Sequence, residues 1–388
     1  MLKLPIENTL DREENIMAEW ITTTLEECTD ILGDGLHGTP KYTENGEYAF
    51  VNGNNLVDGE ILIKKETKRV DYSQYDKYKK PLTNRTILVS INGTLGNVGV
   101  YGSEKIILGK SACYFNVKES VDKDFIYYIV SSPTFKQYLE SNATGTTIKN
   151  ISLKQMREYT FELPEIGEQK RISSVLRKID EKIKNNRAIN NNLEQQVTTV
   201  FYNMFGKYEQ NSNTHKPLST IAKFKYGTMP KKDKLGTGHY HAFSGYQIVG
   251  TYPEVMFENP QLIIVARGVG GCGDVKYTPA NCYLTNLSIA IITEKTMHDD
   301  YLYHYLRLHD TKIMNTGSAQ PQITVATLEK FEIPIPPEEE MIRFSDFVQP
   351  FKQQYRNNQD ENKLLYKLRD TLLSKLMSGE LDVSDIDI

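Results

Sequence analysis

Two long stretches of the chain carry apolar residues at alternating spacings of three and four positions. The first runs from Ile172 to Met204, and the second from Phe344 to Leu376. This spacing is typical of a coiled-coil seam, where a narrow apolar stripe packs against a partner helix. Proline and acidic residues open both stretches, as at helix N-termini. We expect two long helices with seams formed by Ile172, Leu176, Ile179, Ile183, Leu193, Val197, Val200, Phe201 and Met204, and by Phe344, Val348, Phe351, Tyr355, Leu365, Leu368, Leu372 and Leu376.

Both seams are interrupted by asparagine at the same place. Asn186 and Asn190 occupy seam positions of the first helix, and Asn358 and Asn362 lie 172 residues further on. In an antiparallel pair of equal helices the midpoints meet, so Asn186 and Asn190 would face Asn362 and Asn358. Buried asparagines that satisfy one another in one alignment only would set the register, at some cost in stability. The alternative is a local weakness in two surface helices.

The pattern that precedes each helix is repeated as well. Residues 144–164 align without a gap with residues 316–336, and residues 87–93 align with residues 262–268. Each copy reads as short strands, a glycine-rich hairpin, more strands, a helix, a polar loop, a short helix and a last strand. Other matched pairs are Asp124 and Asp300, Gly145 and Gly317, the expected helix N-caps Ser152 and Thr324, and the segments Gly38–Lys41 and Gly227–Lys231.

The repeat predicts an α+β protein in which two similar mixed domains alternate with two long helices. We call residues 1–164 the first head and residues 207–336 the second head; residues 165–206 and 337–388 hold the helices and a tail. The helices would form an antiparallel coiled coil with an approximate internal twofold axis. The first stripe would be about 50 Å long at ~1.5 Å per residue, or about one and a half turns of duplex DNA. Two similar heads on a rigid spacer suit such a ligand.

Composition narrows the classes of protein. The formal net charge is -4, with 46 Lys and Arg against 50 Asp and Glu, which excludes a globally basic DNA coat protein. An apolar fraction of 39% supports packed cores, and no apolar run is long enough to span a bilayer. The N-terminus lacks the apolar region of a secretory signal, and the four cysteines form no C-x-x-C pair. A cytoplasmic protein with reduced thiols is the expected case.

Three segments carry a family resemblance. They are Leu163-Pro-Glu-Ile-Gly-Glu-Gln-Lys-Arg-Ile172, Val200-Phe-Tyr-Asn-Met-Phe-Gly206 and Leu372-Leu-Ser-Lys-Leu-Met-Ser-Gly-Glu-Leu381. With the repeat, they resemble the specificity subunit of type I restriction-modification systems over essentially the whole chain. Two departures stand out: the second helix begins with Glu340-Met341 where the first has Glu168-Gln169, and the first 20 residues have no counterpart.

The resemblance implies a non-catalytic subunit that confers DNA sequence specificity. Each head would be a target recognition domain reading one half of a bipartite site in double-stranded DNA. The coiled coil would set the half-site spacing and dock two modification (methyltransferase) subunits, which restriction subunits then join. No cofactor is expected in this chain; S-adenosylmethionine, Mg and ATP are expected on the partner subunits.

Neither head carries a large basic excess, so a DNA surface must be a local patch. Lys41 and the pair Lys231 and Lys232 follow the repeated Gly-Thr-Pro-type turn, which makes them the preferred phosphate-binding candidates. Ordinary solvated surface is the alternative for all the basic runs. The remaining residues in these runs are Lys77, Lys79, Lys80 and Arg85 in the first head, and Lys223, Lys225 and Lys234 in the second.

Base reading requires donors and acceptors on short, positioned elements, with Arg suited to guanine and Asn or Gln suited to adenine. Asn92 and Arg267 occupy equivalent positions just before the glycine-rich turn. The polar loops of equal length that precede the short helices are the other candidates, although both could be ordinary turns. Their candidate residues are Thr147, Lys149 and Asn150 in the first head, and Gln320 and Gln322 in the second.

Catalytic motifs are weak or absent. Gly268–Gly273 matches G-x-G-x-x-G, but a strand rather than the required helix is expected to follow. His239 and His241 lack further metal ligands at a suitable spacing, and no G-x-x-x-x-G-K-[ST] occurs. A DNA specificity subunit is therefore favoured over a coiled-coil adaptor without a DNA role. A stand-alone methyltransferase is a weaker third possibility.

Overall fold

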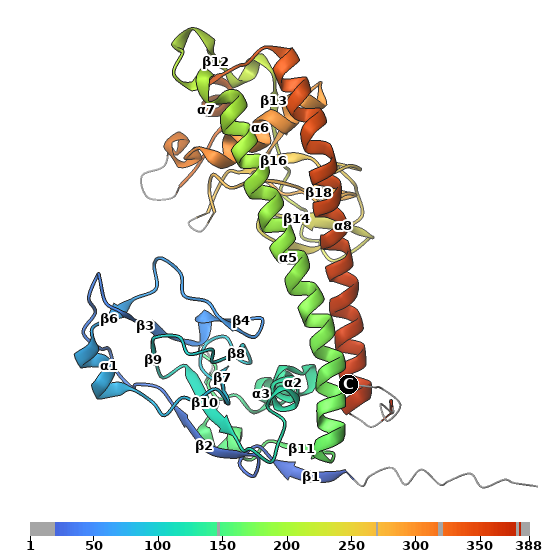
Figure 1. Cartoon of the computed structure of the whole chain (residues 1–388). Coiled ribbons are helices and arrows are strands. Elements are labelled where there is room, and N and C mark those ends of the chain that lie inside the picture. Colours follow the sequence, from blue (N-terminus) through green and yellow to red (C-terminus); the bar gives the residue numbers. More distant parts are fainter. Residues whose placement is uncertain (1–19, 146–147, 269–270, 317–320, 378–379, 382–388) are drawn as a thin grey trace, which may run out of the picture. The chain divides into compact units, whose positions relative to one another are not determined.

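A computed structural model describes residues 20–145, 148–268, 271–316, 321–377 and 380–381. The chain divides into two compact units (Figure 1). Unit 1 comprises residues 1–184 and 362–388, and unit 2 comprises residues 185–361. Each unit therefore holds one head together with a stretch of both long helices.

The head of unit 1 is built around a four-stranded antiparallel sheet in the order β2-β10-β7-β8. The strands β1 and β11 form a separate antiparallel pair. A small sheet, β6-β3-β9, contains one parallel pair, β3 with β9. The strands are β1 (Ile21–Thr24), β2 (Thr29–Asp34), β3 (Tyr48–Val51), β4 (Leu56–Val57), β5 (Glu60–Ile61), β6 (Arg69–Val70), β7 (Thr86–Ser90), β8 (Val98–Val100), β9 (Ile106–Leu108), β10 (Ala112–Val117) and β11 (Thr160–Leu163); the helices are α1 (Tyr72–Tyr78), α2 (Lys123–Ser131), α3 (Pro133–Asn142) and α4 (Leu153–Arg157).

The head of unit 2 has the same plan. Its four-stranded sheet runs β13-β19-β16-β17, its small sheet runs β15-β14-β18, and β12 pairs with β20. The pair β14 and β18 is again parallel. The elements are β12 (His215–Pro217), β13 (Lys223–Tyr226), β14 (Tyr240–Phe243), β15 (Ile248–Tyr252), β16 (Leu262–Val265), β17 (Val275–Tyr277), β18 (Cys282–Leu284), β19 (Ser288–Ile292), β20 (Glu332–Pro334), α6 (Thr296–Leu308) and α7 (Val325–Lys330).

The matching strand orders confirm that the repeat is structural. The strands β7, β10 and β16 are buried along their whole lengths because helices and the small sheet cover the main sheet. Ser152 and Thr324 cap α4 and α7 as expected, since their side chains accept hydrogen bonds from the backbone N–H groups of Gln155 and Thr327. Among the described residues, only the first head contains a short pair like that of β4 and β5.

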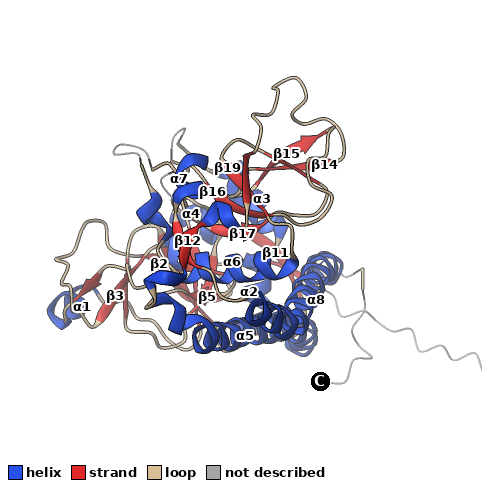
Figure 2. Ribbon diagram, turned by 90° about the horizontal axis from the view of Figure 1, so that it is seen from above, coloured by secondary structure: helices blue, strands red, loops and turns tan. Residues whose placement is uncertain are grey.

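The two long helices are α5 (Ile166–Glu209) and α8 (Glu338–Met377). In unit 1 the first part of α5 and the last part of α8 share a core with the head, through Ile172, Leu176, Leu373 and Leu376. In unit 2 the end of α5 and the start of α8 do the same, through Phe201 and Phe344 among others. Within each unit the helices thus run antiparallel and side by side (Figure 2), which confirms the expected fold class.

One seam position was assigned wrongly. Leu368 is 47% exposed, whereas Leu373 is buried, so the stripe of α8 turns away from the expected track. The guanidinium of Arg369 lies against α5 instead, bound to Asp180. A polar pair therefore replaces one apolar layer, which the spacing of leucines alone does not show. No helix in the described ranges is long and apolar enough to cross a membrane.

Candidate nucleic-acid interface

Four loops of the first head meet at one edge of its sheets. The N–H of Leu36 donates to the carbonyl of Leu108 at 2.7 Å, and the N–H of Lys110 donates back to Leu36 at 3.1 Å. These bonds join the loop after β2 to the turn between β9 and β10. On the other side of that turn, the N–H of Ile91 donates to Ser111 at 2.9 Å. The chain that follows β7 therefore lies next to this turn.

The polar loop before α4 completes the edge. The N–H of Gly93 donates to the carbonyl of Lys149 at 3.0 Å, and the N–H of Ile151 donates to Ile91 at 2.9 Å. These bonds bring Asn92 and Asn150 opposite each other, where Asn92 Nδ2 donates to Asn150 Oδ1 at 3.0 Å. Two residues singled out separately in the sequence, 58 positions apart, thus form one half-buried amide pair.

The second head builds the same edge from equivalent bonds. The N–H of Thr228 donates to Leu284 at 2.9 Å, and the N–H of Ala266 donates to Leu287 at 2.8 Å. The N–H of Ile323 donates to Ala266 at 2.8 Å, which sets Arg267 opposite Gln322. We call these two sets of loops the loop edges: residues 36–41, 91–93, 109–111 and 148–150 in the first head, and residues 227–232, 266–268, 285–287 and 321–322 in the second.

Arg267 occupies the position of Asn92 and has a different setting. Its side chain is exposed, and its backbone carbonyl accepts a hydrogen bond from the Tyr246 hydroxyl at 2.6 Å. A Cβ on Gly268 would lie 2.3 Å from the Tyr246 hydroxyl, and the backbone φ of +118° at this position favours glycine. Tyr246 thereby holds the backbone that presents the guanidinium.

The candidate lysines lie on the outer loop of each edge. Lys41, Lys231 and Lys232 are exposed. The backbone N–H of Lys41 donates to Gln74 Oε1 at 3.0 Å, and that of Lys231 donates to the Tyr252 hydroxyl at 3.3 Å. The loop backbones are therefore anchored while the ammonium groups extend into solvent. Two other candidates, Thr147 and Gln320, lie outside the described residues.

The outer loops also correct a detail of the repeat. Gly35, rather than Gly38, is the counterpart of Gly227, since a Cβ on either would come within 2.3 Å of a backbone carbonyl at the end of β9 or β18. The sequence match between Gly38–Lys41 and Gly227–Lys231 is displaced by three residues from the structural one. Lys41 lies six residues after Gly35, whereas Lys231 and Lys232 lie four and five residues after Gly227, so the lysines are analogous but not equivalent in position.

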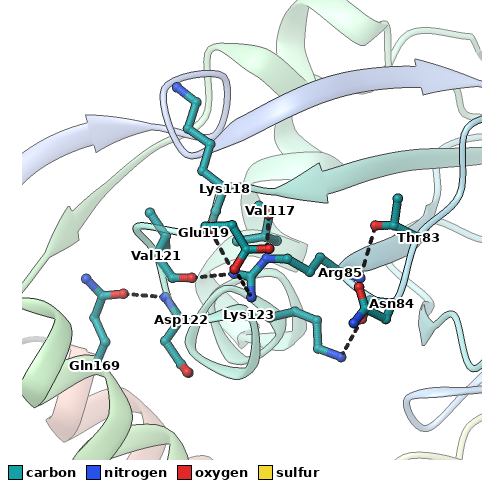
Figure 3. Close-up of polar contacts among 10 residues, drawn as sticks. All are labelled: Thr83, Asn84, Arg85, Val117, Lys118, Glu119, Val121, Asp122, Lys123 and Gln169. Carbon is teal, nitrogen blue, oxygen red and sulfur yellow. Dashed lines mark hydrogen bonds and ion pairs between the residues drawn. The ribbon is translucent and has the colours of Figure 1, made fainter.

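Arg85 is not a DNA-binding candidate. Its guanidinium donates to the backbone carbonyls of Val117, Lys118 and Val121 at 2.6–2.8 Å, at the end of β7 remote from Asn92 (Figure 3). A guanidinium that binds three backbone carbonyls stabilises the fold of its own loop. Other members of the basic runs form ion pairs, namely Lys79 with Asp76, Lys223 with Glu294, and Lys234 with Glu254.

Figure 3 also shows that Gln169, near the start of α5, links this helix to the start of α2. Gln169 Oε1 accepts a hydrogen bond from the N–H of Asp122, the N-cap residue of α2. The side-chain amide of Gln169 also donates to the carbonyl of Pro164. The side chain is 3% exposed. Met341 is the equivalent residue in the second copy and is buried in an apolar core. The equivalent position therefore holds a hydrogen-bonded glutamine in the first copy and an apolar methionine in the second.

The asparagine layer is buried on both helices. Asn358 Nδ2 donates to Asn190 Oδ1 at 2.8 Å, so these two face each other as expected. Asn186 Nδ2 donates to Glu361 Oε2 at 2.7 Å. Asn362, in unit 1, is 8% exposed. Whether the layer sets the register stays a prediction.

Two turns on the loop edges were missed by reading the sequence. Residues 109–112 and 285–288 each form a tight turn, with an N–H of residue 112 or 288 donating to residue 109 or 285. Lys110 and Asn286 are the equivalent residues at the tips; Lys110 is exposed and Asn286 half-buried. The repeat aligns the flanking strands at an offset of 176, but only tertiary bonds show that each turn lies between the outer lysine loop and Asn92 or Arg267.

No group of His, Cys, Asp and Glu that could hold a metal ion occurs in the described part of the chain. All four cysteines are buried, and burial raises the pKa of the Cys113 thiol. The glycine-rich segment that begins at Gly268 is followed by the strand β17, as expected, and not by the helix that a dinucleotide site needs.

Comparison with known proteins assigns the family. Residues 17–195 and 208–366 each match the sequence model described as the type I restriction modification DNA specificity domain. Because the two matches cover most of the chain, the chain belongs to this family. The repeat found in the sequence corresponds to two copies of that domain.

Curated relatives match over nearly their whole length. The type I restriction enzyme MjaIX specificity subunit of Methanocaldococcus jannaschii is 23% identical over 393 aligned positions, which cover 90% of this chain and 87% of the relative. A putative type I specificity subunit of Mycoplasma genitalium is also 23% identical, with 92% and 93% covered. The crystal structure of a type I restriction-modification S subunit from M. genitalium has the same fold, with a TM-score of 0.56 at 21% identity, covering 94% of this chain and 98% of that one.

These findings confirm the expected class. The chain is a DNA specificity subunit of the type I restriction-modification family and is not itself the catalytic subunit. The alternative of a coiled-coil adaptor without DNA specificity finds no support.

Proposed function

We propose that each head reads one half of a bipartite target in double-stranded DNA through its loop edge. The observation that carries this assignment is the pair of equivalent positions Asn92 with Asn150 and Arg267 with Gln322. The same backbone bonds present different side chains in the two heads. A shared frame with different donors and acceptors is what two heads need in order to read different sequences.

The side chains on the loop edges divide by chemistry. Lysines on the outer loops, Lys41, Lys231 and Lys232, would neutralise phosphates and position the duplex. The exposed guanidinium of Arg267 matches the two acceptors of guanine in the major groove. The amides of Asn92, Asn150 and Gln322 match adenine, and Lys149 would contact either phosphate or a base. Thr147 and Gln320 belong to the same loops in the sequence and keep their assignment as candidates.

The coiled coil would set the spacing between the half-sites and dock two modification subunits, with restriction subunits joining that core. The assembly would work in the cytoplasm. S-adenosylmethionine, Mg and ATP would bind to those partners, with no cofactor in this chain. The mixed seam of α5 and α8, with its Asn190–Asn358 hydrogen bond, supports a defined alignment of the two helices within unit 2.

The test is sequence-specific methylation by the full chain with its modification subunits on a randomised DNA library. We expect one bipartite motif with a constant spacer, and duplex binding that weakens steeply as salt rises. The chain alone should transfer no methyl group. Methylation without sequence preference, or methyl transfer by the isolated chain, would contradict the proposal.

A further inference from the structure

The tight turns between β9 and β10 and between β18 and β19 occupy the middle of the loop edges. In the first head, Lys110 itself donates to Leu36 of the outer loop, and Ser111 accepts from Ile91 next to Asn92. In the second head, Leu284 and Leu287 flank the turn; Leu284 accepts from Thr228 of the outer loop, as Leu108 does from Leu36, and Leu287 accepts from Ala266 next to Arg267. Any duplex that contacts both the outer lysines and the inner pair must therefore pass over the turn tip.

The residues at the tips differ between the heads. The outer loops carry exposed lysine in both heads, as expected for phosphate contacts, which hold no sequence information. The inner pairs differ, with two asparagines in one head and arginine with glutamine in the other. The residues at the turn tips also differ between the heads, with Lys110 in the first and Asn286 in the second. In this respect they resemble the inner pairs and not the lysines of the outer loops.

We propose that Lys110 and Asn286 are specificity-determining residues, each reading a base of its own half-site beside the base read by Asn92 or Arg267. Lysine donates to the acceptors O6 and N7 of guanine, whereas asparagine pairs with N6 and N7 of adenine. The turn geometry suits this task, since an N–H to carbonyl bond closes each turn and fixes the tip within the edge. This inference rests on the proposed function of the loop edges.

The experiment uses the full chain with its modification subunits and a randomised DNA library, and it measures base frequencies at methylated sites. Asn286→Ala should lower discrimination about 5- to 150-fold at one or two adjacent positions of the second half-site, the range of one good base contact. Lys110→Ala should do the same in the first half-site only. The exchanges Asn286→Lys and Lys110→Asn should change the preferred base there.

Matched controls are a lysine and an asparagine away from the loop edges, near the starts of β7 and β16. Lys123→Ala removes a lysine bound to the carbonyl of Asn84, just before β7 begins. Asn259→Ala removes an exposed asparagine three residues before β16 begins. Both controls should keep the wild-type motif. The melting temperatures of all variants should match that of the wild type, because the turn residues substituted are not in a core.

Four outcomes separate the possibilities. A change confined to one half-site supports the inference. Equal weakening on every sequence, with a shallower salt dependence for Lys110→Ala and an unchanged motif, shows a phosphate contact and overturns it. A wild-type complex that methylates without any sequence preference overturns both the inference and the proposed function, whereas an unchanged motif in all four variants overturns the inference alone.

Discussion

The two heads share a frame but are fastened to the coil by different chemistry. In unit 1, Asp180 of α5 accepts from the Tyr128 hydroxyl at 2.9 Å and from Arg369 of α8 at 3.0 Å. In unit 2, the carboxylate lies on the head: Asp300 accepts from Ser345 at 2.6 Å and Gln349 at 2.8 Å and pairs with Lys352, all on α8. The two copies of the repeat share their apolar packing and glycine turns. The charged residues between head and helices, in contrast, lie at different positions in the two copies.

The equivalent aspartates make the contrast plain. Asp300 is 1% exposed, whereas the side chain of its counterpart Asp124 is 36% exposed and lies 3.5 Å from Arg177. A buried carboxylate depends on its partners, because its charge has lost most of its water. The second head should therefore be more sensitive than the first to changes in the charges beneath it.

The largest effect should come from dividing the chain. Residues 1–206 retain one head and α5, whose apolar seam would be exposed without α8; each fully buried Leu or Ile is worth about 1.5–3 kcal/mol. A second copy supplies a nearly equivalent helix, so we expect an isologous homodimer. With modification subunits it should methylate the first half-site in inverted repeat.

Sedimentation measures the outcome for this fragment. The fragment lacks Arg369, the partner of Asp180, so its dimer should be less stable than the intact coil. A stable monomer, or methylation still directed to the original asymmetric site, would show that the two halves cannot replace each other.

Lys352→Ala should cost about 3–5 kcal/mol of unfolding free energy, because it leaves the carboxylate of Asp300 buried without a cation. The matched variant Arg177→Ala, at the more exposed Asp124, should cost about 0–1 kcal/mol. Urea denaturation of the full chain measures both. Equal losses would show that burial of the aspartate does not decide the dependence on a cation.

Arg267→Ala should weaken recognition of the second half-site by about 1–3 kcal/mol and relax base preference there only. Asn92→Ala is the matched change and should relax the first half-site only, because the two residues hold equivalent positions. The readout is the methylated motif in the presence of modification subunits. If the Arg267→Ala protein is folded and the methylated motif is unchanged, Arg267 does not read a base.

The second head should also respond to acid through His304. Burial lowers the pKa of this imidazole to about 3, whereas an unfolded histidine titrates near 6.5. Between these values the unfolded state binds the extra proton, so stability should fall as pH drops, by at most about 1.4 kcal/mol per pH unit. In the first head the equivalent residue is Tyr128, whose pKa is raised by burial and by Asp180, so it stays neutral in this range.

The variant His304→Tyr copies the first head and should flatten this part of the stability profile. Denaturation midpoints between pH 4 and pH 7 provide the measurement. A profile with the same slope in the variant would assign the acid sensitivity to other groups.

The smallest effect on stability is expected in the asparagine layer. Replacing Asn186, Asn190, Asn358 and Asn362 by Leu should strengthen helix pairing, because buried polar side chains are less stabilising than packed leucines. The same change should loosen the register and broaden the spacer between half-sites. One unchanged spacer would show that helix length and the remaining apolar packing are sufficient.

The sequence by itself determined the architecture. Helix periodicity, the N-caps Ser152 and Thr324 and the ungapped repeat are local or translational signals, so they can be read along the chain. They predicted both long helices, two similar α+β heads and the facing pair Asn190 and Asn358. They also predicted the equivalence of Asn92 and Arg267, whose flanking strands and loops are repeated in the same order.

Only the tertiary structure decided which polar groups work together. Arg85 looks like a surface cation in the sequence, and its three carbonyl partners lie more than 30 residues away. Arg369 displaces Leu368 from the seam because Asp180 lies opposite it, 189 residues away. Lys110 gains its place on the loop edge from its own backbone bond to Leu36, and Asn286 gains its place from the bonds of its neighbours Leu284 and Leu287. Such partnerships depend on distances in space between segments remote in sequence, and no period along the chain encodes them.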